Sequence, residues 1–248
     1  MPAKTRAEAF RAMHDRPDPA DPLVIPNVWD ALSARVFADA GFPILATSSA
    51  AVAASLGYED GGHTPADEMF AAVTRIVRSA GVPVTADIEA GYGLPPKEIT
   101  ERLIEAGVVG CNLEDTDPAT GNLKDPDEHA DWLAELSTAA GDRLVLNARV
   151  DTFLYDGDRD RRLESAIRRG VLYTAAGADV VYPILAPVDL LPAIAESLRA
   201  PLNALQLPGG PSPAELGRLG ASRVTFGHTL HGRVTDALRD IAAEVRGG

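Results

Sequence analysis

The sequence predicts an α/β protein built as a single (β/α)₈ (TIM) barrel that spans residues 1–248. Its length of 248 residues is close to the roughly 250 residues that this barrel typically needs. One unit also recurs along the chain, as in AGFPILAT (40–47), AGVPVTAD (80–87) and AGADVVYPI (176–184). In each copy a helix ends in Ala, Gly takes the left-handed cap, and a buried apolar strand follows. Apolar strands between amphipathic helices indicate a parallel sheet that is covered on its outer face.

The strands are expected where short apolar runs alternate with amphipathic segments. In chain order these runs are 23–27, 43–48, 82–87, 108–114, 143–149, 179–184, 201–205 and 223–226. The second, third, fourth and sixth runs directly follow an Ala-Gly helix end, and the eighth follows a weaker copy of it, LGASRVTFG (219–227). An open doubly wound sheet is the alternative, but no G-x-G-x-x-G string follows the first strand.

The segments between these runs are expected as helices, for example 66–79, 126–139, 158–175 and 186–198. The first of these begins after a Thr-Pro pair, which is typical of a helix start. We expect the N-terminal segment, up to about residue 20, to form a helix that caps the barrel, and 229–246 to form a final amphipathic helix. The small-residue segment 47–62, TSSAAVAASLGYEDGG, is expected as a loop that leaves the second strand.

Composition argues against several classes of function. The net charge of −13 and the pI of 4.8 argue against nucleic acid as a partner, because phosphate binding needs a concentrated basic surface. No apolar run approaches the roughly 18 residues of a membrane helix, and the polar N-terminus shows no secretory signal. The single cysteine, Cys111, cannot form an intramolecular disulfide and fits a reducing compartment, so we expect a cytoplasmic protein without a membrane partner.

Charged residues follow three neighbouring strands, in the strings TADIEAGYG (85–93), CNLEDT (111–116) and NARVDTF (147–153). Because side chains alternate along a strand, Asp87 and Glu89 are expected on one face, and Glu114 ends the next strand in the same way. The alternative is that they are ordinary surface acids, but the run before Asp87 is apolar. Gathered carboxylates repel unless a cation lies between them, and an all-oxygen cluster suits Mg²⁺ or Mn²⁺. The sequence therefore predicts a metal-dependent enzyme.

Arg149 ends the fifth expected strand, whose inward face would also carry Asn147 and Asp151. A surface salt bridge is the alternative interpretation. An arginine at the rim of an acidic metal site is better explained by two-point binding of a substrate carboxylate or phosphonate. Asp60 lies in the glycine-flanked end of the 47–62 segment, from which it could reach the metal through water.

Other polar residues are open to two interpretations. Asn203 lies in a short apolar strand and is either a hydrogen-bonded core amide or a ligand-binding group at the rim. His228 and His231 favour a structural role over metal ligation. Cys111 shares its strand face with Leu113, which favours packing over nucleophilic chemistry.

Taken together, these strings resemble the isocitrate lyase/phosphoenolpyruvate mutase superfamily over roughly residues 20–240. The family's D-x-[DE]-x-G-Y-G string appears here as residues 87–93, and its Glu-Asp after the fourth strand as Glu114-Asp115. Its Ala-Arg after the fifth strand is Ala148-Arg149, and its Leu-Gly-x-x-Asp string after the second strand is residues 56–60.

The resemblance implies a modified (β/α)₈ barrel, often a tetramer built from dimers that exchange the eighth helix. It also implies Mg²⁺ bound directly by Asp87, and mostly through water by Asp60, Glu89 and Glu114. The loop that binds the substrate's carboxylate in the family would match Ser48 and the backbone of Ser49 and Ala50.

The chain departs from the family in the loop after the fourth strand. Isocitrate and methylisocitrate lyases carry a Lys-[Lys/Arg]-Cys-Gly-His string there, and phosphoenolpyruvate mutases carry a Lys-x-Asn-Ser type lid. This chain has TDPATGNLKDPDEH (116–129), which contains no cysteine, lacks the lid lysine and retains only Asn122-Leu123 in a similar position.

The predicted function is a Mg²⁺-dependent C–C bond lyase that acts on a small 2-oxo or 2-hydroxy (di)carboxylic acid through a metal-stabilised enolate. Arg149 would hold the far anionic group of the substrate, with Ser48–Ala50, Asp87 and Asn203 as further substrate-binding residues. The general acid/base is expected among Tyr58, Glu114, the 116–125 lid with Asn122, and a metal-bound water.

Two alternatives remain open at this point. One is a C–P bond enzyme of the phosphonopyruvate type, either a hydrolase or a mutase. The other is a protein that binds a 2-oxo acid with little turnover. A homo-oligomer, dimer or tetramer, is expected in each case.

Overall fold

The computed structural model describes residues 3–247, and the strands in that range form one sheet in which every neighbouring pair is parallel. The strands are β1 (Leu23–Val24), β2 (Asn27–Val28), β3 (Leu45–Thr47), β4 (Val84–Asp87), β5 (Gly110–Glu114), β6 (Val145–Val150), β7 (Val180–Pro183), β8 (Leu202–Leu205) and β9 (Ala221–Thr225). Their order in the sheet is β1-β9-β8-β7-β6-β5-β4-β3-β2.

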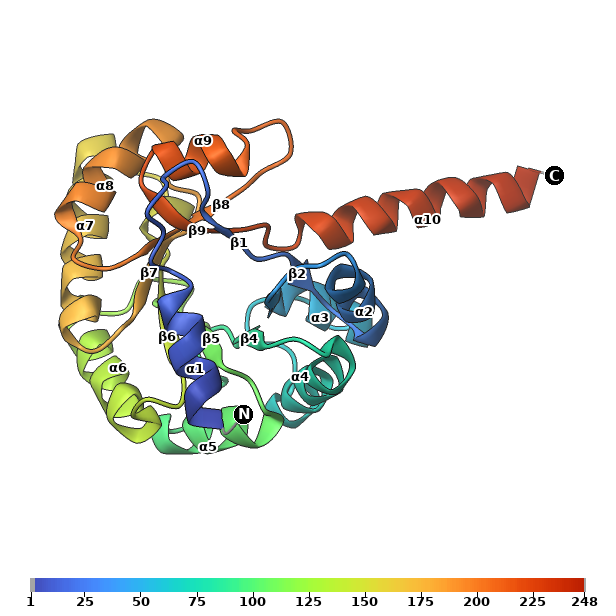
Figure 1. The fold of residues 1–248 in the computed structure, drawn as a ribbon, viewed down its shortest axis with the longest axis horizontal. Coiled ribbons are helices and arrows are strands. Elements are labelled where there is room, and N and C mark those ends of the chain that lie inside the picture. Colours follow the sequence, from blue (N-terminus) through green and yellow to red (C-terminus); the bar gives the residue numbers. More distant parts are fainter. Residues whose placement is uncertain (1–2, 248) are drawn as a thin grey trace.

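Helices alternate with these strands around the molecule (Figure 1). They are α1 (Ala3–Ala12), α2 (Ala31–Asp39), α3 (Ser49–Leu56), α4 (Ala66–Ala80), α5 (Pro96–Ala106), α6 (Pro126–Ala140), α7 (Arg159–Ala175), α8 (Leu191–Ser197), α9 (Pro213–Arg218) and α10 (Thr229–Gly247). Two short 3₁₀ helices, η1 (Thr152–Leu154) and η2 (Val188–Leu190), follow β6 and β7.

The barrel closes through its first strand, which is split in two. β1 pairs with β9 and β2 pairs with β3, and only Ile25 and Pro26 separate the two halves. The Ile25 N–H donates to Val224 O at 2.9 Å, whereas Pro26 O accepts from the Ala46 N–H at 3.0 Å. The chain therefore passes from one neighbouring strand to the other within this segment, and the two edges of the sheet are joined. Counted this way, the predicted eight strands and (β/α)₈ architecture are confirmed.

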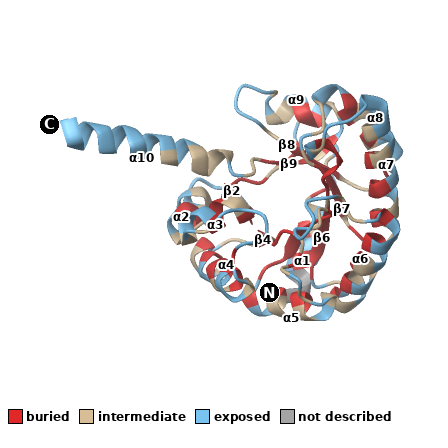
Figure 2. Cartoon of the chain, turned by 180° about the vertical axis from the view of Figure 1, so that it is seen from behind, coloured by how far each residue is buried: buried red, intermediate tan, exposed pale blue. Residues whose placement is uncertain are grey.

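The helix α1 closes one end of the barrel, as expected for the N-terminal segment. Phe10 of α1 is buried in a cluster with Ile25 and with residues at or just before the strand starts, such as Ile44 and Val109. Arg11 binds Asp179, the residue just before β7, with Nε and Oδ1 2.6 Å apart. The helix therefore covers the amino ends of the strands and leaves their carboxyl ends free. The strands themselves are the most continuously buried part of the chain (Figure 2).

Two expectations for individual elements need correction. Residues 49–56 form the helix α3 and not a loop, because this alanine-rich run has high helix propensity and Gly57, at φ 90°, ends it in the left-handed conformation. The helix expected at 186–198 is shorter, since α8 begins only at Leu191. Pro192 stands in its first turn, the position where proline is tolerated.

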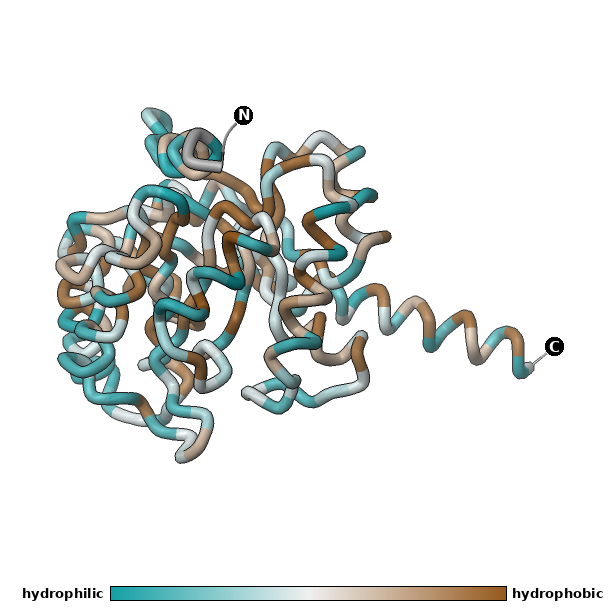
Figure 3. Tube along the Cα trace, turned by 90° about the horizontal axis from the view of Figure 1, so that it is seen from below, coloured by the Kyte–Doolittle hydropathy of each residue, from teal (hydrophilic) through white to brown (hydrophobic). Residues whose placement is uncertain are grey.

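The last helix, α10, leaves the barrel instead of covering it (Figures 1 and 3). None of its 19 residues is buried. Its large apolar side chains recur at helical spacing and are 45–79% exposed: Val234, Leu238, Ile241 and Val245. On α2, Leu32 and Val36 are likewise 62% and 56% exposed. Across residues 3–247, no helix has both the length and the apolar character needed to cross a membrane.

Candidate active site

A cavity of about 280 Å³ opens at the carboxyl ends of the strands, where barrels of this class place their ligands. Six residues predicted from the sequence line it: Ser48, Ser49, Ala50, Asp60, Asp87 and Arg149. They come from the chain after β3, from the end of β4 and from β6, and are far apart in sequence. The fold therefore brings the predicted metal ligand, Asp87, and the predicted anion-binding group, Arg149, to one cavity.

Asp87 is held at the start of α3. Its Oδ2 accepts hydrogen bonds from the Ser49 N–H at 3.3 Å and the Ser49 hydroxyl at 3.0 Å, and its own N–H donates to Thr47 Oγ1 at 2.8 Å. Burial raises the pKa of Asp87, while the positive charge of Arg149 and the Ser49 hydrogen bonds lower it. The nearby carboxylate of Asp60 raises it again. A cation at this position would relieve both the burial and the repulsion.

The segment that begins at Ser48 presents the start of a helix to the cavity. Ser48 is the N-cap of α3 and is 3% exposed, and Ser49 and Ala50 are the first two residues of the helix. Their small side chains allow a ligand to approach the backbone N–H groups, which carry the positive end of the helix dipole. This is the arrangement expected for binding a carboxylate.

Glu114 and Arg149 are opposite each other because β5 and β6 are paired in that register. Arg149 Nη1 lies 2.7 Å from Glu114 Oε2, and its Nε donates to Asp151 Oδ1 at 2.6 Å. Glu114 is 8% exposed, and burial raises its pKa to about 8 in spite of the adjacent guanidinium. The Arg149 guanidinium thus contacts the carboxyl groups of Glu114 and Asp151 before any substrate binds.

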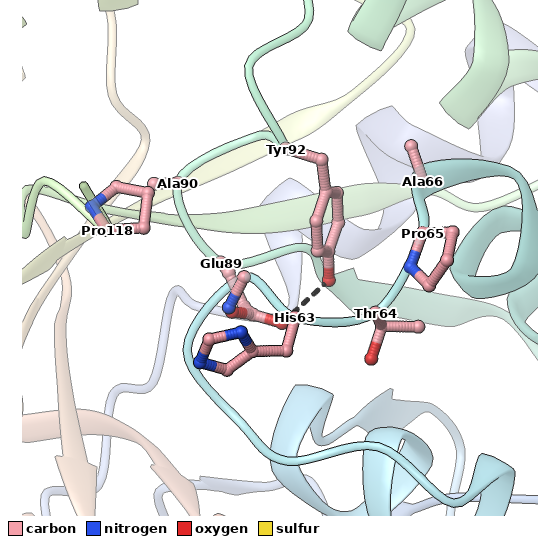
Figure 4. A pocket seen from close by; sticks show the side chains of 9 residues that line it. His63, Thr64, Pro65, Ala66, Glu89, Ala90, Tyr92 and Pro118 are labelled. Atoms are coloured by element: carbon pink, nitrogen blue, oxygen red, sulfur yellow. Dashed lines mark hydrogen bonds between the residues drawn. The ribbon is translucent and has the colours of Figure 1, made fainter.

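Glu89 is positioned by a turn and not by the strand. β4 ends at Asp87, and Glu89 has φ 51°, in the left-handed region that is uncommon for residues other than glycine. Its carboxylate accepts hydrogen bonds from the Tyr92 hydroxyl at 3.0 Å and from the Gly62 N–H. It lines a neighbouring cavity of about 250 Å³ together with His63 and Thr64 (Figure 4). The two-residue period of a strand therefore does not explain where this side chain lies.

The carboxylates of this region fit a magnesium ion with a large share of water ligands. Burial, together with the charges of Asp60 and Asp87, raises the pKa of Glu89 to about 7. The charges of Asp87 and Glu89 also contribute to the raised pKa of Glu114. Within residues 3–247, no three Asp, Glu, His or Cys side chains form a ready-made ligand set. Mg²⁺ commonly takes one or two carboxylates directly and keeps several waters. A set of oxygen ligands in which Asp87 binds the ion directly and the other acids bind it through water molecules is compatible with that preference.

The loop 116–125 is folded against the site as a small hairpin. Thr116 and Leu123 form an antiparallel bridge, and the Lys124 N–H donates to Asp115 O at 2.8 Å. Thr116 Oγ1 donates to Asp151 Oδ2 at 2.6 Å, and the Tyr155 hydroxyl donates to Gly121 O at 2.9 Å. These contacts attach the loop to the segment that carries Arg149.

Asp115, the residue after β5, supports this loop through buried hydrogen bonds. It is fully buried and accepts hydrogen bonds from the Asp151 N–H at 2.8 Å, from Arg169 Nη1 at 2.9 Å and from the Tyr173 hydroxyl at 2.7 Å. Arg169 Nη2 also donates to Lys124 O at 2.9 Å. Asp115 therefore connects the base of the loop to α7.

Five predicted residues do not line the cavity: Glu89 lines the neighbouring one, Glu114 contacts Arg149 of the wall, and Tyr58, Asn122 and Asn203 lie elsewhere. The Tyr58 hydroxyl donates to Glu68 at 2.7 Å on the outer surface, and Asn122 is exposed within the 116–125 hairpin, where its amide donates to Thr120 O at 3.3 Å. Asn203 is fully buried and donates to Thr225 Oγ1 at 3.0 Å. Of the two interpretations that the sequence left open, the structure therefore favours the hydrogen-bonded core amide. Thr225, and not Asn203, reaches the cavity wall.

Sequence reasoning missed several wall residues, namely Asn27, Asn112, Tyr182 and Thr225. Asn27 donates to Thr47 O at 2.9 Å and accepts from the Phe226 N–H at 2.7 Å, so it ties three strand ends together. A signal was present, because each of these polar residues interrupts an otherwise apolar strand. A polar group in such a strand is explained only by the barrel interior or by a ligand.

Comparisons with known proteins agree with this geometry. The model of the phosphoenolpyruvate phosphomutase family matches residues 10–246. The chain is 34% identical to an oxaloacetate decarboxylase of Pseudomonas paraeruginosa, over 89% of this chain and 79% of that protein. It is 30% identical to the 2-methylisocitrate lyase of Bacillus subtilis, over 84% of this chain and 69% of that protein. A solved structure from Burkholderia cenocepacia, assigned as a phosphonomutase, has a TM-score of 0.87 and 38% identity, and covers 97% of this chain and 99% of its own.

Proposed function

The chain belongs to the phosphoenolpyruvate phosphomutase family, within the isocitrate lyase/phosphoenolpyruvate mutase superfamily, and from that premise we propose a Mg²⁺-dependent lyase that cleaves a C–C bond of a small 2-oxo or 2-hydroxy carboxylic acid. One observation carries this proposal: Asp87 and Arg149 line the same cavity. A metal-binding carboxylate and an anion-binding guanidinium can then hold the two ends of one small acid. The oxaloacetate decarboxylase and the 2-methylisocitrate lyase among its relatives both act on carboxylic acids.

Asp87 would bind the cation directly, and Asp60, Glu89 and Glu114 would orient the water molecules around it. When bound, the cation supplies stabilisation of the negative charge that develops on the oxygen of the 2-oxo group as the C–C bond breaks. Mn²⁺ has the same preference for oxygen ligands and is expected to substitute for Mg²⁺.

Arg149 and the start of α3 would orient the substrate. The Arg149 guanidinium has five N–H donors, and its Nε and one Nη2 hydrogen are already used by Asp151. Nη1 also lies 2.7 Å from Glu114 Oε2, so one hydrogen on Nη1 and one on Nη2 remain to bind an anionic group of the substrate. The Ala50 N–H and the Ser48 side chain at the start of α3 would bind the other carboxylate, while the Ser49 N–H donates to Asp87.

Glu114 is the residue that we propose for proton transfer. Its pKa of about 8 allows it to hold a proton at neutral pH and to release one without a large free-energy cost. Tyr58 and Asn122 are less suitable, because their side chains hydrogen-bond to Glu68 and Thr120 at the surface, whereas Glu114 contacts Arg149 of the cavity wall. The hairpin 116–125 lies beside Glu114 and would limit the access of water during the reaction.

We also propose that the protein is a homo-oligomer in which α10 packs on a second copy. The apolar stripe of α10 and the exposed Leu32 and Val36 of α2 are complementary surfaces with no cover in the single chain. Light scattering after gel filtration would measure the assembled mass. Leu238→Asp is expected to reduce that mass, whereas Asp240→Asn, on the opposite face of the helix, is expected to leave it unchanged; an unchanged mass for both would contradict the proposal.

The reaction itself can be assigned by assay with Mg²⁺ and three substrates: oxaloacetate, phosphonopyruvate and 2-methylisocitrate. Turnover of a carboxylic acid, lost on addition of EDTA and restored by Mg²⁺, is the expected result. Turnover of phosphonopyruvate alone would replace the proposal with C–P bond chemistry, the alternative favoured by the similarity to the Burkholderia phosphonomutase. Binding of these acids without any turnover would indicate a 2-oxo acid binding protein.

A further inference from the structure

Asn112 of β5 is a polar residue of the cavity wall that has no role in the chemistry proposed above. It lines the cavity at the carboxyl ends of the strands and is 5% exposed. In the register between β4 and β5, Asn112 is paired with Asp87, the proposed direct metal ligand. The amide therefore lies beside the position where the cation and the oxygens of the acid would meet.

The oxygen of this amide is already engaged inside the barrel. Asn112 Oδ1 accepts a hydrogen bond from Asn147 Nδ2 at 2.7 Å, and Arg223 Nη2 lies 3.5 Å from the same oxygen. Arg223 is fully buried, Asn147 is 1% exposed, and neither residue lines the cavity. Among residues 3–247, Asn112 Nδ2 has no hydrogen-bond partner. The two N–H donors of this amide are thus unpaired at the wall of the cavity.

Arg223 determines the orientation of the two amides. Each amide carries both an acceptor and donors, so Asn112 and Asn147 can form their hydrogen bond in either direction. If both amides were reversed, the Asn112 N–H₂ group would face Arg223, and a guanidinium has no acceptor. Unpaired buried donors are costly, so this reversed arrangement is disfavoured. The guanidinium therefore fixes the Asn112 oxygen toward the barrel interior and the N–H₂ group toward the cavity.

The burial of Arg223 is only weakly compensated by the rest of the fold. Its Nε and Nη1 have no hydrogen-bond partner in the part of the chain that the structure describes. Along β9, Arg223 shares a face with Thr225, which lines the cavity, so the guanidinium lies one layer beneath the cavity. Residues that destabilise a fold are typical of functional sites. The position of Arg223 thus indicates a role in holding the amide that faces the ligand.

We propose that Asn112 is a substrate-binding residue, whose N–H₂ group donates a hydrogen bond to an oxygen of the bound acid beside Asp87. Asn147 and Arg223 are positioning residues that hold the amide in this orientation. The inference rests on the proposed function, because it requires the acid to occupy this cavity. A neutral donor suits this position, since it binds an anionic oxygen without repelling the neighbouring cation, as a lysine would.

Oxalate is the probe for this inference, because it has the planar shape and the adjacent oxygens of a 2-oxo acid. Calorimetric titration of the full chain with oxalate, in the presence of Mg²⁺, measures its affinity. Asn112→Leu replaces the amide with a neutral side chain of similar size. We expect oxalate to bind this variant about 10- to 100-fold more weakly, since a hydrogen bond to a charged group is lost. Its affinity for Mg²⁺ alone should stay within about twofold of wild type.

Arg223→Met keeps the donors of Asn112 but removes the group that orients them. We expect oxalate to bind about threefold to tenfold more weakly, as the fraction of molecules with a correctly oriented amide falls. The melting temperature should rise in the same variant, because a buried charge is removed. A residue that only supports the fold would not show these two opposite effects.

A double variant and a control locate the effect. In the Asn112→Leu background, Arg223→Met should cause no further loss of oxalate affinity, because Arg223 acts through the amide. Thr85→Val is the control. Thr85 is 1% exposed on β4, its hydroxyl has no hydrogen-bond partner among the described residues, and it does not line the cavity. Its replacement should leave the oxalate affinity within about twofold of wild type.

The outcomes separate this inference from the proposed function. If oxalate binds Asn112→Leu as tightly as wild type, or if Thr85→Val causes an equal loss, the role of Asn112 is wrong and the lyase proposal stands. If Arg223→Met leaves oxalate binding unchanged, or weakens it equally in both backgrounds, the positioning role of Arg223 is overturned. If neither oxalate nor any of the three assay substrates binds the wild-type chain with Mg²⁺, the proposed function fails and the inference fails with it.

Discussion

The two sides of the cavity are built by different means. On the polar side, strands set the positions: Glu114 is beside Arg149 because β5 and β6 pair in that register, and Asp87 is the last residue of β4. On the opposite side, Leu185 and Leu207 belong to loops that follow β7 and β8. Asp87 and Arg149, the groups for which we propose chemical roles, therefore lie on rigid strands, whereas Leu185 and Leu207 of the opposite wall lie on loops.

The largest effect is expected on the polar side, from Asp87→Ala. The variant removes the proposed direct metal ligand, so we expect kcat/KM to fall by about 1,000-fold or more, with loss of Mg²⁺ binding. Steady-state kinetics and calorimetric titration with Mg²⁺ measure the two effects. Asp160→Ala, an exposed acid on α7, serves as the control. An Asp87→Ala enzyme with normal rate and metal dependence would refute the metal site.

A smaller effect is expected from Arg149→Lys, which retains the charge beside Glu114 and Asp151 but removes the planar fork of donors. We expect a decrease in kcat/KM of about 100-fold that appears mainly in KM. Arg161→Lys, at an exposed arginine of α7, is the matched control. A normal KM together with a reduced kcat would show that Arg149 acts on the reacting atoms and not on substrate binding.

The buried acids of the polar side also predict a dependence on pH. The pKa values of Glu89 and Glu114, about 7 and about 8, lie above their ordinary value of 4.5. Between these values the folded chain binds more protons than the unfolded chain. The free energy of unfolding of the metal-free protein should therefore decrease as pH rises from about 5 to 8.

Mg²⁺ must displace the same protons, so its affinity should increase over this pH range by up to about tenfold per pH unit for each proton released. Melting temperatures at pH 6 and pH 8.5, with EDTA or with Mg²⁺, measure both trends. Glu89→Gln should reduce the number of protons released. An affinity for Mg²⁺ that does not change with pH would show that these carboxylates do not contact the ion or its waters.

The smallest effect concerns an arginine of β9 that contrasts with Arg149. Arg223 is fully buried, and burial lowers its pKa to about 10. Its Nε and Nη1 have no hydrogen-bond partner among the described residues, and its guanidinium lies 5.8 Å from the centre of the Phe10 ring. Arg223→Met is therefore expected to increase the free energy of unfolding by about 1–3 kcal/mol, measured by urea denaturation. A loss of stability would show that the charge has partners, such as buried water or an anion, inside the barrel.

The sequence was sufficient for the fold and for half of the site. Ala-Gly helix ends followed by apolar runs identified the strands, because both signals are local in the chain. Asp87, Arg149 and Ser48 were correctly placed at one cavity, because the carboxyl ends of parallel strands meet at one rim. The strand period failed at Glu89, since β4 ends two residues earlier and a left-handed turn orients the side chain.

Other residues could not be placed because their partners are distant in sequence. The sequence left Asn203 open to two interpretations. The structure decides between them, because Asn203 hydrogen-bonds to Thr225, 22 residues away. The leucines that line the cavity could not be predicted from the sequence for the same reason. Leu154, Leu185 and Leu207 are unremarkable leucines in three separate loops, and no local pattern shows that they face one cavity.

By themselves, the Ala-Gly helix ends and apolar runs determined the (β/α)₈ barrel, and the acidic strings with Arg149 predicted the metal-and-anion site that we propose at its rim. Residue type and the alternation of side chains along a strand are sufficient for this prediction, because both signals extend over only a few residues. Only the tertiary structure decided which acids lie on the cavity, how the 116–125 loop is attached, and which leucines form the opposite wall. These features depend on the register between strands and on the conformations of loops. Both are stabilised by contacts between residues that are far apart in the chain, so no local pattern in the sequence reveals them.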